Sequence, residues 1–261
     1  MTTKLNLALL LCDTPAPQVV QNFGAYNKLF PEIFDKACPD NVEISWQSFD
    51  VVHRQEYPSF EDIQAKKYDG IVITGSVRSA YEQEEWILKL IEYVKDIRSK
   101  APETRIVGVC FGHQIVAMAC GGTCVSNPKG WEFGYTATKL TTEGQRYLNT
   151  DKAYMAIQEV HKDHVPDVPE GFICLASTAP HTPVQLMVSK DNRVISVQGH
   201  PEFPPELVGI LLNVRLGKGI LDNDFVQEAM TKLFTDPLDN VWLVEHFIQF
   251  LLGKTPNPQD M

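Results

Sequence analysis

Residues 106–114 read IVGVCFGHQ, and this stretch decides the fold that we predict. The apolar run into Cys110 indicates a buried strand over residues 106–109, followed directly by a helix. Gly108 and Gly112 stand two residues before and two residues after the cysteine. Glycines at these places let a strand and the next helix approach closely in a sharp strand–turn–helix elbow. The stretch therefore predicts an α/β sheet that raises Cys110 at the end of a strand.

The first half of the chain repeats this alternation of apolar runs and amphipathic stretches. We expect strands at residues 5–11, 42–51, 71–73 and 106–109, and helices at residues 19–37, 82–99 and from the elbow to about Ala119. Ser59, with Asp62 three residues later, indicates one further helix start. Apolar strands without alternation, separated by helices, predict a mostly parallel central sheet that is covered by helices on both faces.

The second half has a different texture, with shorter strands that look antiparallel. We expect a smaller antiparallel segment from strands at residues 135–140, 172–176, 184–188 and 194–197, and closing helices at residues 205–217, 224–235 and 241–252. No repeat or linker interrupts the chain. We therefore predict a single domain over residues 1–261, with a frayed tail over residues 253–261.

Composition and charge exclude several classes of protein. A hydrophobic content of 44% with 21% charged residues is ordinary for a globular protein. The net charge of −10, without any basic run, argues against a nucleic-acid or membrane-surface partner. Residues 5–11 are too short for a signal peptide, and no apolar stretch approaches the roughly 20 residues that span a bilayer. We expect a soluble, cytoplasmic protein.

The six cysteines and the glycine pattern predict neither a metal nor a cofactor. Cys120 and Cys124 form one close pair, but a metal site needs two further ligands at similarly tight spacing. Without a secretory signal, we expect reduced thiols rather than disulfides. A Gly-x-Gly-x-x-Gly fingerprint is missing after the first strand, which argues against a dinucleotide.

A second motif supplies a base for Cys110. Residues 197–203 read VQGHPEF, so His200 ends an apolar strand and Pro201 restricts it to an extended backbone. The Glu202 side chain then points to the same side as the imidazole and can fix its tautomer. We predict Cys110 as nucleophile, His200 as base and Glu202 as the residue that orients it. His113 ranks well below His200 as a base, because it lies on the helix that begins at the nucleophile.

Together, residues 108–114 and the His200-Pro201-Glu202 motif resemble the catalytic motifs of class I glutamine amidotransferases. The resemblance extends roughly over residues 5–215. It implies a flavodoxin-like fold and hydrolysis of a γ-glutamyl amide through a thioester. It also implies that the backbone N–H groups of Gly75 and Phe111 form an oxyanion hole, and that Gln114 helps to hold the substrate.

Two further segments resemble substrate-binding segments of the family's GMP-synthase-like branch. They are residues 131–134, WEFG, and residues 160–165, VHKDHV, where that branch usually has a glycine in place of Lys162. The substrate-binding residues that this resemblance implies are Trp131, Glu132, Phe133, His161 and Asp163. The two aromatic residues fit a position in the core equally well.

The resemblance leaves two enzymatic hypotheses open, both with a small-molecule γ-glutamyl substrate. One is a stand-alone hydrolase that resembles the γ-glutamyl peptidases. The other is a glutaminase subunit that delivers ammonia to a separate synthase partner, since the chain has no Gly-rich lysine loop for a nucleotide. A non-catalytic binding protein is a third hypothesis, and the presence of all three predicted catalytic residues argues against it.

Overall fold

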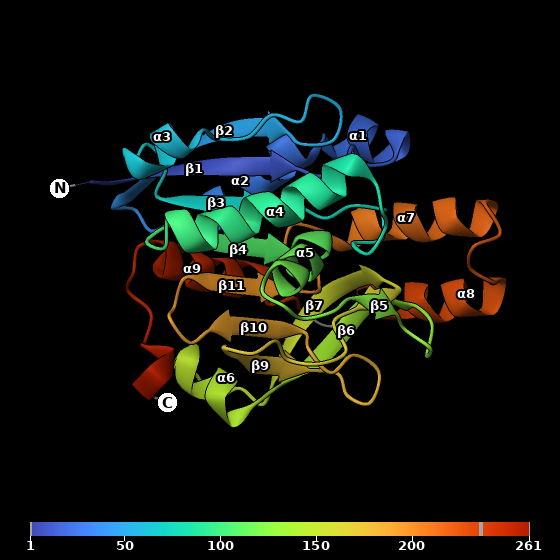
Figure 1. Ribbon diagram of the computed structural model, residues 1–261. Coiled ribbons are helices and arrows are strands. Elements are labelled where there is room, and N and C mark those ends of the chain that lie inside the picture. The colour runs from blue at the N-terminus through green and yellow to red at the C-terminus, as the bar shows by residue number, and fades with distance from the viewer. Residues whose placement is uncertain (1, 235–236, 261) are drawn as a thin grey trace.

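The computed structural model describes residues 2–234 and 237–260 (Figure 1). A nine-stranded sheet forms its centre, in the order β2-β1-β3-β4-β11-β10-β9-β6-β7. Its strands are β1 (Thr3–Leu11), β2 (Val42–Asp50), β3 (Gly70–Ile73), β4 (Arg105–Val109), β6 (Glu132–Leu140), β7 (Tyr154–His161), β9 (Phe172–Ser177), β10 (Leu186–Ser189) and β11 (Val194–Val197). A separate antiparallel pair joins β5 (Val125–Ser126) to β8 (Asp163–His164).

Helices cover both faces of the sheet, as Figure 1 shows. They are α1 (Pro17–Phe23), α2 (Tyr26–Ala37), α3 (Phe60–Gln64), α4 (Glu85–Lys100), α5 (Phe111–Ala119), α6 (Thr142–Tyr147), α7 (Pro205–Gly217), α8 (Asn223–Lys232) and α9 (Asn240–Leu251), with a 3₁₀ turn at Pro258–Asp260. The predicted α/β class is confirmed. None of the helices in the described part of the chain has both the length and the apolarity needed to cross a bilayer.

The sheet consists of a parallel half and an antiparallel half that meet at β11. Strands β2, β1, β3, β4 and β11 run parallel to one another, and β4 pairs with β11 so that Val109 lies opposite Val197. From β11 through β10, β9, β6 and β7 every pairing is antiparallel. The predicted antiparallel segment is therefore confirmed, and it continues the same sheet as the parallel strands.

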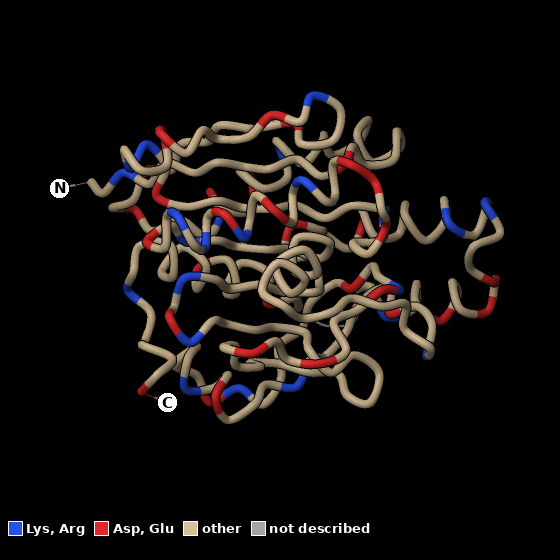
Figure 2. Tube along the Cα trace, in the orientation of Figure 1, with Lys and Arg blue, Asp and Glu red and all other residues tan. Residues whose placement is uncertain are grey.

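Alternate side chains of the central strands enter two separate cores. In β1, Leu5, Leu7 and Leu9 pack in the cluster that contains α2 and α9, whereas Ala8 and Leu10 pack in the cluster that contains α4 and α5. Helix α5 carries no charged residue along its length (Figure 2). Burial of both faces explains why residues 7–10 of β1 are apolar without alternation.

Several predicted boundaries are wrong for local reasons. The helix predicted at residues 19–37 is two helices, because Gly24 has a φ of 91° and Ala25 is extended. Strand β7 was not predicted, since the buried polar residues Gln158 and Glu159 interrupt its apolar pattern. The helix predicted to end at Thr235 is described only to Lys232, and Thr235 lies outside the described residues.

The segment between β6 and β7 and the C-terminal tail also differ from what we expected. Helix α6 was not predicted, although the Thr141 hydroxyl caps it by accepting from the Gly144 N–H at 2.8 Å. The tail that we expected to be frayed contains the 3₁₀ turn with a buried Pro258. In the same tail, the Thr255 hydroxyl accepts a hydrogen bond from Tyr147 at 3.2 Å. Met261 lies outside the described residues.

The first turn of α5 crosses β3 so closely that a side chain cannot fit between them. A Cβ atom on Gly112 would overlap the carbonyl oxygen of Ile73. We predict that Gly112→Ala lowers the free energy of unfolding by about 2 kcal/mol or more, because backbone on both sides must move. Chemical denaturation monitored by circular dichroism measures this change.

Gly217 provides the matched control, since it is also helical and a Cβ atom there would meet no atom within 4 Å. We expect Gly217→Ala to leave stability unchanged or to raise it by about 0.5 kcal/mol. Equal stability of the two variants would show that the crossing at Gly112 has no steric importance.

Candidate active site

Cys110 lies in a strained elbow between β4 and α5. It is the N-cap of α5, with φ of 52° and ψ of −105°, a region that residues other than glycine rarely adopt. A Cβ atom on Gly108 would lie 2.6 Å from the carbonyl oxygen of Gly112. Hydrogen bonds hold the elbow, since the Cys110 N–H donates to Val197 and its carbonyl accepts from the Gln114 N–H. The two glycines thus allow the conformation, and strand β11 fixes it.

His200 and Glu202 follow β11, the strand beside β4. The His200 Nδ1 and the Glu202 Oε1 lie 2.8 Å apart, and both side chains are buried. The imidazole stacks on Phe203 with ring centroids 4.1 Å apart and an interplanar angle of 2°. The backbone N–H of His200 donates to the Gln158 carbonyl at 2.8 Å. These contacts fix the orientation of the ring beside Cys110.

The electrostatics of this group distinguish His200 from His113. Burial lowers the pKa of His200, but the charges and hydrogen bonds of Cys110 and Glu202 raise it well above its usual value. Burial lowers the pKa of His113 to about 3, and its Nδ1 lies 2.9 Å from the Ser196 hydroxyl. His113 is therefore a neutral core residue, whereas His200 is poised to hold a proton.

Other thiols have surroundings that disfavour the thiolate. The pKa is raised at all five cysteines other than Cys110, and burial is the largest cause at each. They are Cys12, Cys38, Cys120, Cys124 and Cys174. None of the six cysteines forms a disulfide. Cys110 alone of the six stands at an elbow beside a histidine and carboxylate pair.

The loop after β3 brings Gly75 against the same group. A Cβ atom on Gly75 would lie 2.9 Å from the Cε1 of His200 and 3.6 Å from the Cβ of Cys110. Asp13 holds this loop by accepting the Val77 N–H at 2.8 Å. Phe111 is the first residue of α5, where an N–H has no intrahelical acceptor. Both residues predicted for the oxyanion hole therefore lie next to Cys110.

A polar cavity of about 340 Å³ opens at Cys110, and four of the predicted substrate-binding residues line it. They are Gln114, Trp131, His161 and Asp163. The Gln114 Nε2 donates to the Asp163 carbonyl at 3.0 Å, which ties α5 to β8. The Asp163 carboxylate accepts from the hydroxyl groups of Ser79 and Tyr81. Sequence reasoning missed Ser79 and Tyr81, since nothing in their neighbourhood signals a site.

Phe133 and Glu132 do not line this cavity. Phe133 is buried in the core, which is the alternative that the sequence left open. The Glu132 carboxylate lies 3.0 Å from the His161 Nε2 and accepts from the Gln185 amide at 2.6 Å. Glu132 therefore reaches the site indirectly, through His161.

A buried cluster of charge supports the floor of the cavity. His161 lies between Glu132 and Glu159, with its Nε2 at 3.3 Å from the Glu159 carboxylate, and its Nδ1 lies 3.0 Å from the Asp163 carbonyl. Burial raises the pKa of Glu159 to about 7. Although burial opposes it, hydrogen bonds to the two carboxylates raise the pKa of His161 to about 10.

The same three side chains are a possible ligand set for a cation. Their ligand atoms lie within 4.8 Å of one another. A protonated His161 neutralises one of the two carboxylates, and the proton that Glu159 holds below about pH 7 neutralises the other, so we interpret the cluster as a shared-proton network. Sequence reasoning missed Glu159, because the strand that carries it was not predicted and a lone glutamate forms no motif.

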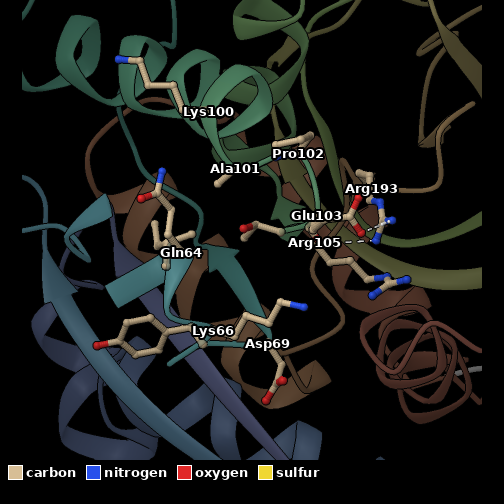
Figure 3. A pocket seen from close by; sticks show the side chains of 12 residues that line it. Gln64, Lys66, Asp69, Lys100, Ala101, Pro102, Glu103, Arg105 and Arg193 are labelled. Atoms are coloured by element: carbon tan, nitrogen blue, oxygen red, sulfur yellow. Dashed lines mark hydrogen bonds and ion pairs between the residues drawn. The ribbon is translucent and has the colours of Figure 1, made fainter. Parts of the chain in front are cut away.

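Another hollow, of about 390 Å³, lies at the opposite end of the strands, where β4 begins with Arg105 (Figure 3). Figure 3 shows the ion pair of Glu103 with Arg193, in which Oε2 of the glutamate lies 2.6 Å from Nη2 of the arginine. Ligands of open α/β sheets bind at the carboxyl ends of the strands, and Cys110 and His200 lie at that other end. The hollow is therefore not part of the candidate site.

Several known proteins are similar to this chain. A family model described as glutamine amidotransferase class-I matches residues 41–210. The chain is 34% identical over 252 residues to a glutamine amidotransferase-like protein of Schizosaccharomyces pombe, covering 95% of this chain and 98% of that protein. It is 29% identical over 236 residues to gamma-glutamyl peptidase 4 of Arabidopsis thaliana, covering 88% and 89%. A solved glutamine amidotransferase structure from Methylobacillus flagellatus has a TM-score of 0.70 at 17% identity, covering 98% and 97%.

The buried cluster predicts a pH dependence of stability. Glu159 has an ordinary pKa of 4.5 in an unfolded chain and a pKa of about 7 in the folded protein. Between these values the folded protein holds a proton that the unfolded chain has lost, so the contribution of Glu159 to stability falls as pH rises. In the variant Glu159→Gln, the carboxamide that replaces the carboxyl group does not titrate in this pH range. We expect the free energy of unfolding of the wild type, minus that of this variant, to fall from pH 4.5 to about 7.

Chemical denaturation of both proteins across this pH range measures the difference. A difference that rises with pH, or that stays constant, would contradict the assignment of a raised pKa to Glu159.

Proposed function

The chain belongs to the class I glutamine amidotransferase family, and from this membership we propose that it hydrolyses γ-glutamyl amide bonds with Cys110 as the nucleophile. The observation that carries the proposal is the buried His200–Glu202 hydrogen bond of 2.8 Å beside a cysteine at a strained elbow. This arrangement provides a nucleophile, a base and a group that orients the base.

In the first half of the reaction, the Nε2 of His200 accepts the Cys110 thiol proton and the sulfur attacks the γ-carbonyl carbon. Glu202 holds the Nδ1–H and stabilises the imidazolium that forms. The N–H groups of Gly75 and Phe111 would receive the developing oxyanion. The intermediate then collapses to a thioester, and the departing amine takes the proton from His200.

In the second half, a water molecule attacks the thioester carbon while His200 accepts its proton. The carbon–sulfur bond breaks, glutamate leaves and the imidazolium returns the proton to the Cys110 sulfur. The polar cavity beside Cys110 suits the γ-glutamyl group, because the Asp163 carboxylate can face its α-ammonium group. Gln114 and His161 would act by positioning Asp163, since both contact its backbone carbonyl.

Similarity to a gamma-glutamyl peptidase over most of both chains favours a stand-alone hydrolase. The alternative is a glutaminase that delivers ammonia to a separate synthase partner. Substrate preference separates these hypotheses, because a peptidase prefers γ-glutamyl peptides and a glutaminase subunit prefers glutamine.

We predict that Cys110→Ala lowers hydrolysis by on the order of 10⁴-fold, because no other thiol can replace the nucleophile. Glutamate release from glutamine, glutathione and γ-glutamyl dipeptides measures the activity. Cys120→Ala, at the other end of α5, is the matched control and should keep wild-type activity. Hydrolysis that survives Cys110→Ala would refute the mechanism.

We also predict that Glu202→Gln lowers kcat by about 10²- to 10⁴-fold, because the amide cannot stabilise the imidazolium. The exposed Glu206, on the first turn of α7, provides the control in Glu206→Gln. Steady-state rates over a range of pH check the result. Equal kcat values for the two variants would exclude an orienting role for Glu202.

A further inference from the structure

A second cavity, of about 360 Å³, adjoins the polar cavity on the side of His200. Cys110 lines the first cavity and His200 lines the second. Four residues line both, namely Ser76, Val77, Val160 and Arg215. The two cavities therefore meet where the nucleophile and the base lie.

The proposed chemistry assigns a role to each side of this junction. The acyl group stays on the Cys110 sulfur, whereas the departing nitrogen takes its proton from His200. Whatever is attached to that nitrogen must then lie in the cavity that His200 lines. Ammonia is about the size of a water molecule, so a cavity of about 360 Å³ far exceeds what it needs.

The wall of the second cavity is apolar over most of its extent. Helix α7 contributes Leu207, Leu211 and Val214, which are spaced so that they share one face of the helix. Phe203 and Tyr26 also line the cavity, and their rings stack with centroids 6.4 Å apart. Such a wall suits an aliphatic or aromatic side chain.

Two cationic residues follow these apolar side chains, one in the last turn of α7 and one just after the helix. Arg215 and Lys218 line the cavity, and within the described residues neither forms an ion pair. The Arg215 guanidinium lies over the Trp131 ring at 5.1 Å. Asp13 also lines the cavity; its carboxylate accepts the N–H groups of Thr14 and Val77, and its charge acts on Arg215 without an ion pair between them. The unpaired cations suit a carboxylate next to an apolar side chain.

We propose that this cavity is the leaving-group subsite, and that it takes an apolar amino-acid residue with a free α-carboxylate. The inference rests on the proposed hydrolysis. It implies that the preferred substrates are γ-glutamyl dipeptides with an apolar second residue, such as γ-glutamyl-leucine. Leu211 and its neighbours contact the side chain, while Arg215 and Lys218 bind the carboxylate.

The test compares kcat/KM for γ-glutamyl-leucine, γ-glutamyl-leucinamide and glutamine. We expect Leu211→Asp to lower the ratio of kcat/KM for γ-glutamyl-leucine to kcat/KM for glutamine about tenfold or more. Lys218→Gln should reduce the preference for γ-glutamyl-leucine over its amide about threefold or more. Asn213→Asp is the matched control on the exposed side of α7, and all three changes lower the net charge by one. The control should keep both ratios.

The outcomes separate this inference from the proposed function. Cys110-dependent hydrolysis with both ratios unchanged in Leu211→Asp and Lys218→Gln would overturn the subsite and leave the hydrolase. If no substrate is hydrolysed, calorimetry of γ-glutamyl-leucine with Cys110→Ala still tests the cavity. Binding that Leu211→Asp weakens supports the subsite, and absent or unchanged binding overturns it.

Discussion

The close crossing of α5 over β3 and β4 is the constraint on which the candidate site depends. Gly108 and Gly112 allow the backbones to meet there, and Cys110 takes a positive φ as a result. The crossing places the Cys110 sulfur both at the carboxyl end of β4 and at the amino end of α5. Since β11 pairs with β4 in parallel, His200 arrives at the same edge of the sheet.

The two halves of the sheet contribute different parts of the site. The parallel half supplies Cys110 and Gly75, whose strands end at a common edge. The antiparallel half begins at β11 and supplies the buried cluster of Glu132, Glu159 and His161 under the polar cavity. Strand β11 belongs to both halves, and His200, which follows it, lies where the two halves meet.

Sequence predicted the parts of the site that depend on local patterns. Glycines around Cys110 and the His200-Pro201-Glu202 motif determine backbone shape within a few residues, so they could be read directly. The role of Glu159 could not, because it depends on Glu132 of the neighbouring strand β6, which shares the partner His161. Phe133 was ambiguous for the same reason, since its burial depends on helices α7 and α8, which follow about 70 residues later or more.

The proposed reaction depends on a covalent intermediate at Cys110. A glutamine analogue with a diazoketone in place of the carboxamide alkylates a cysteine that attacks this position. Peptide mapping by mass spectrometry then identifies the labelled thiol. We expect one adduct per chain, on Cys110, which γ-glutamyl-leucine suppresses by competition. An adduct on another cysteine, or none in protein that hydrolyses the substrate, would contradict it.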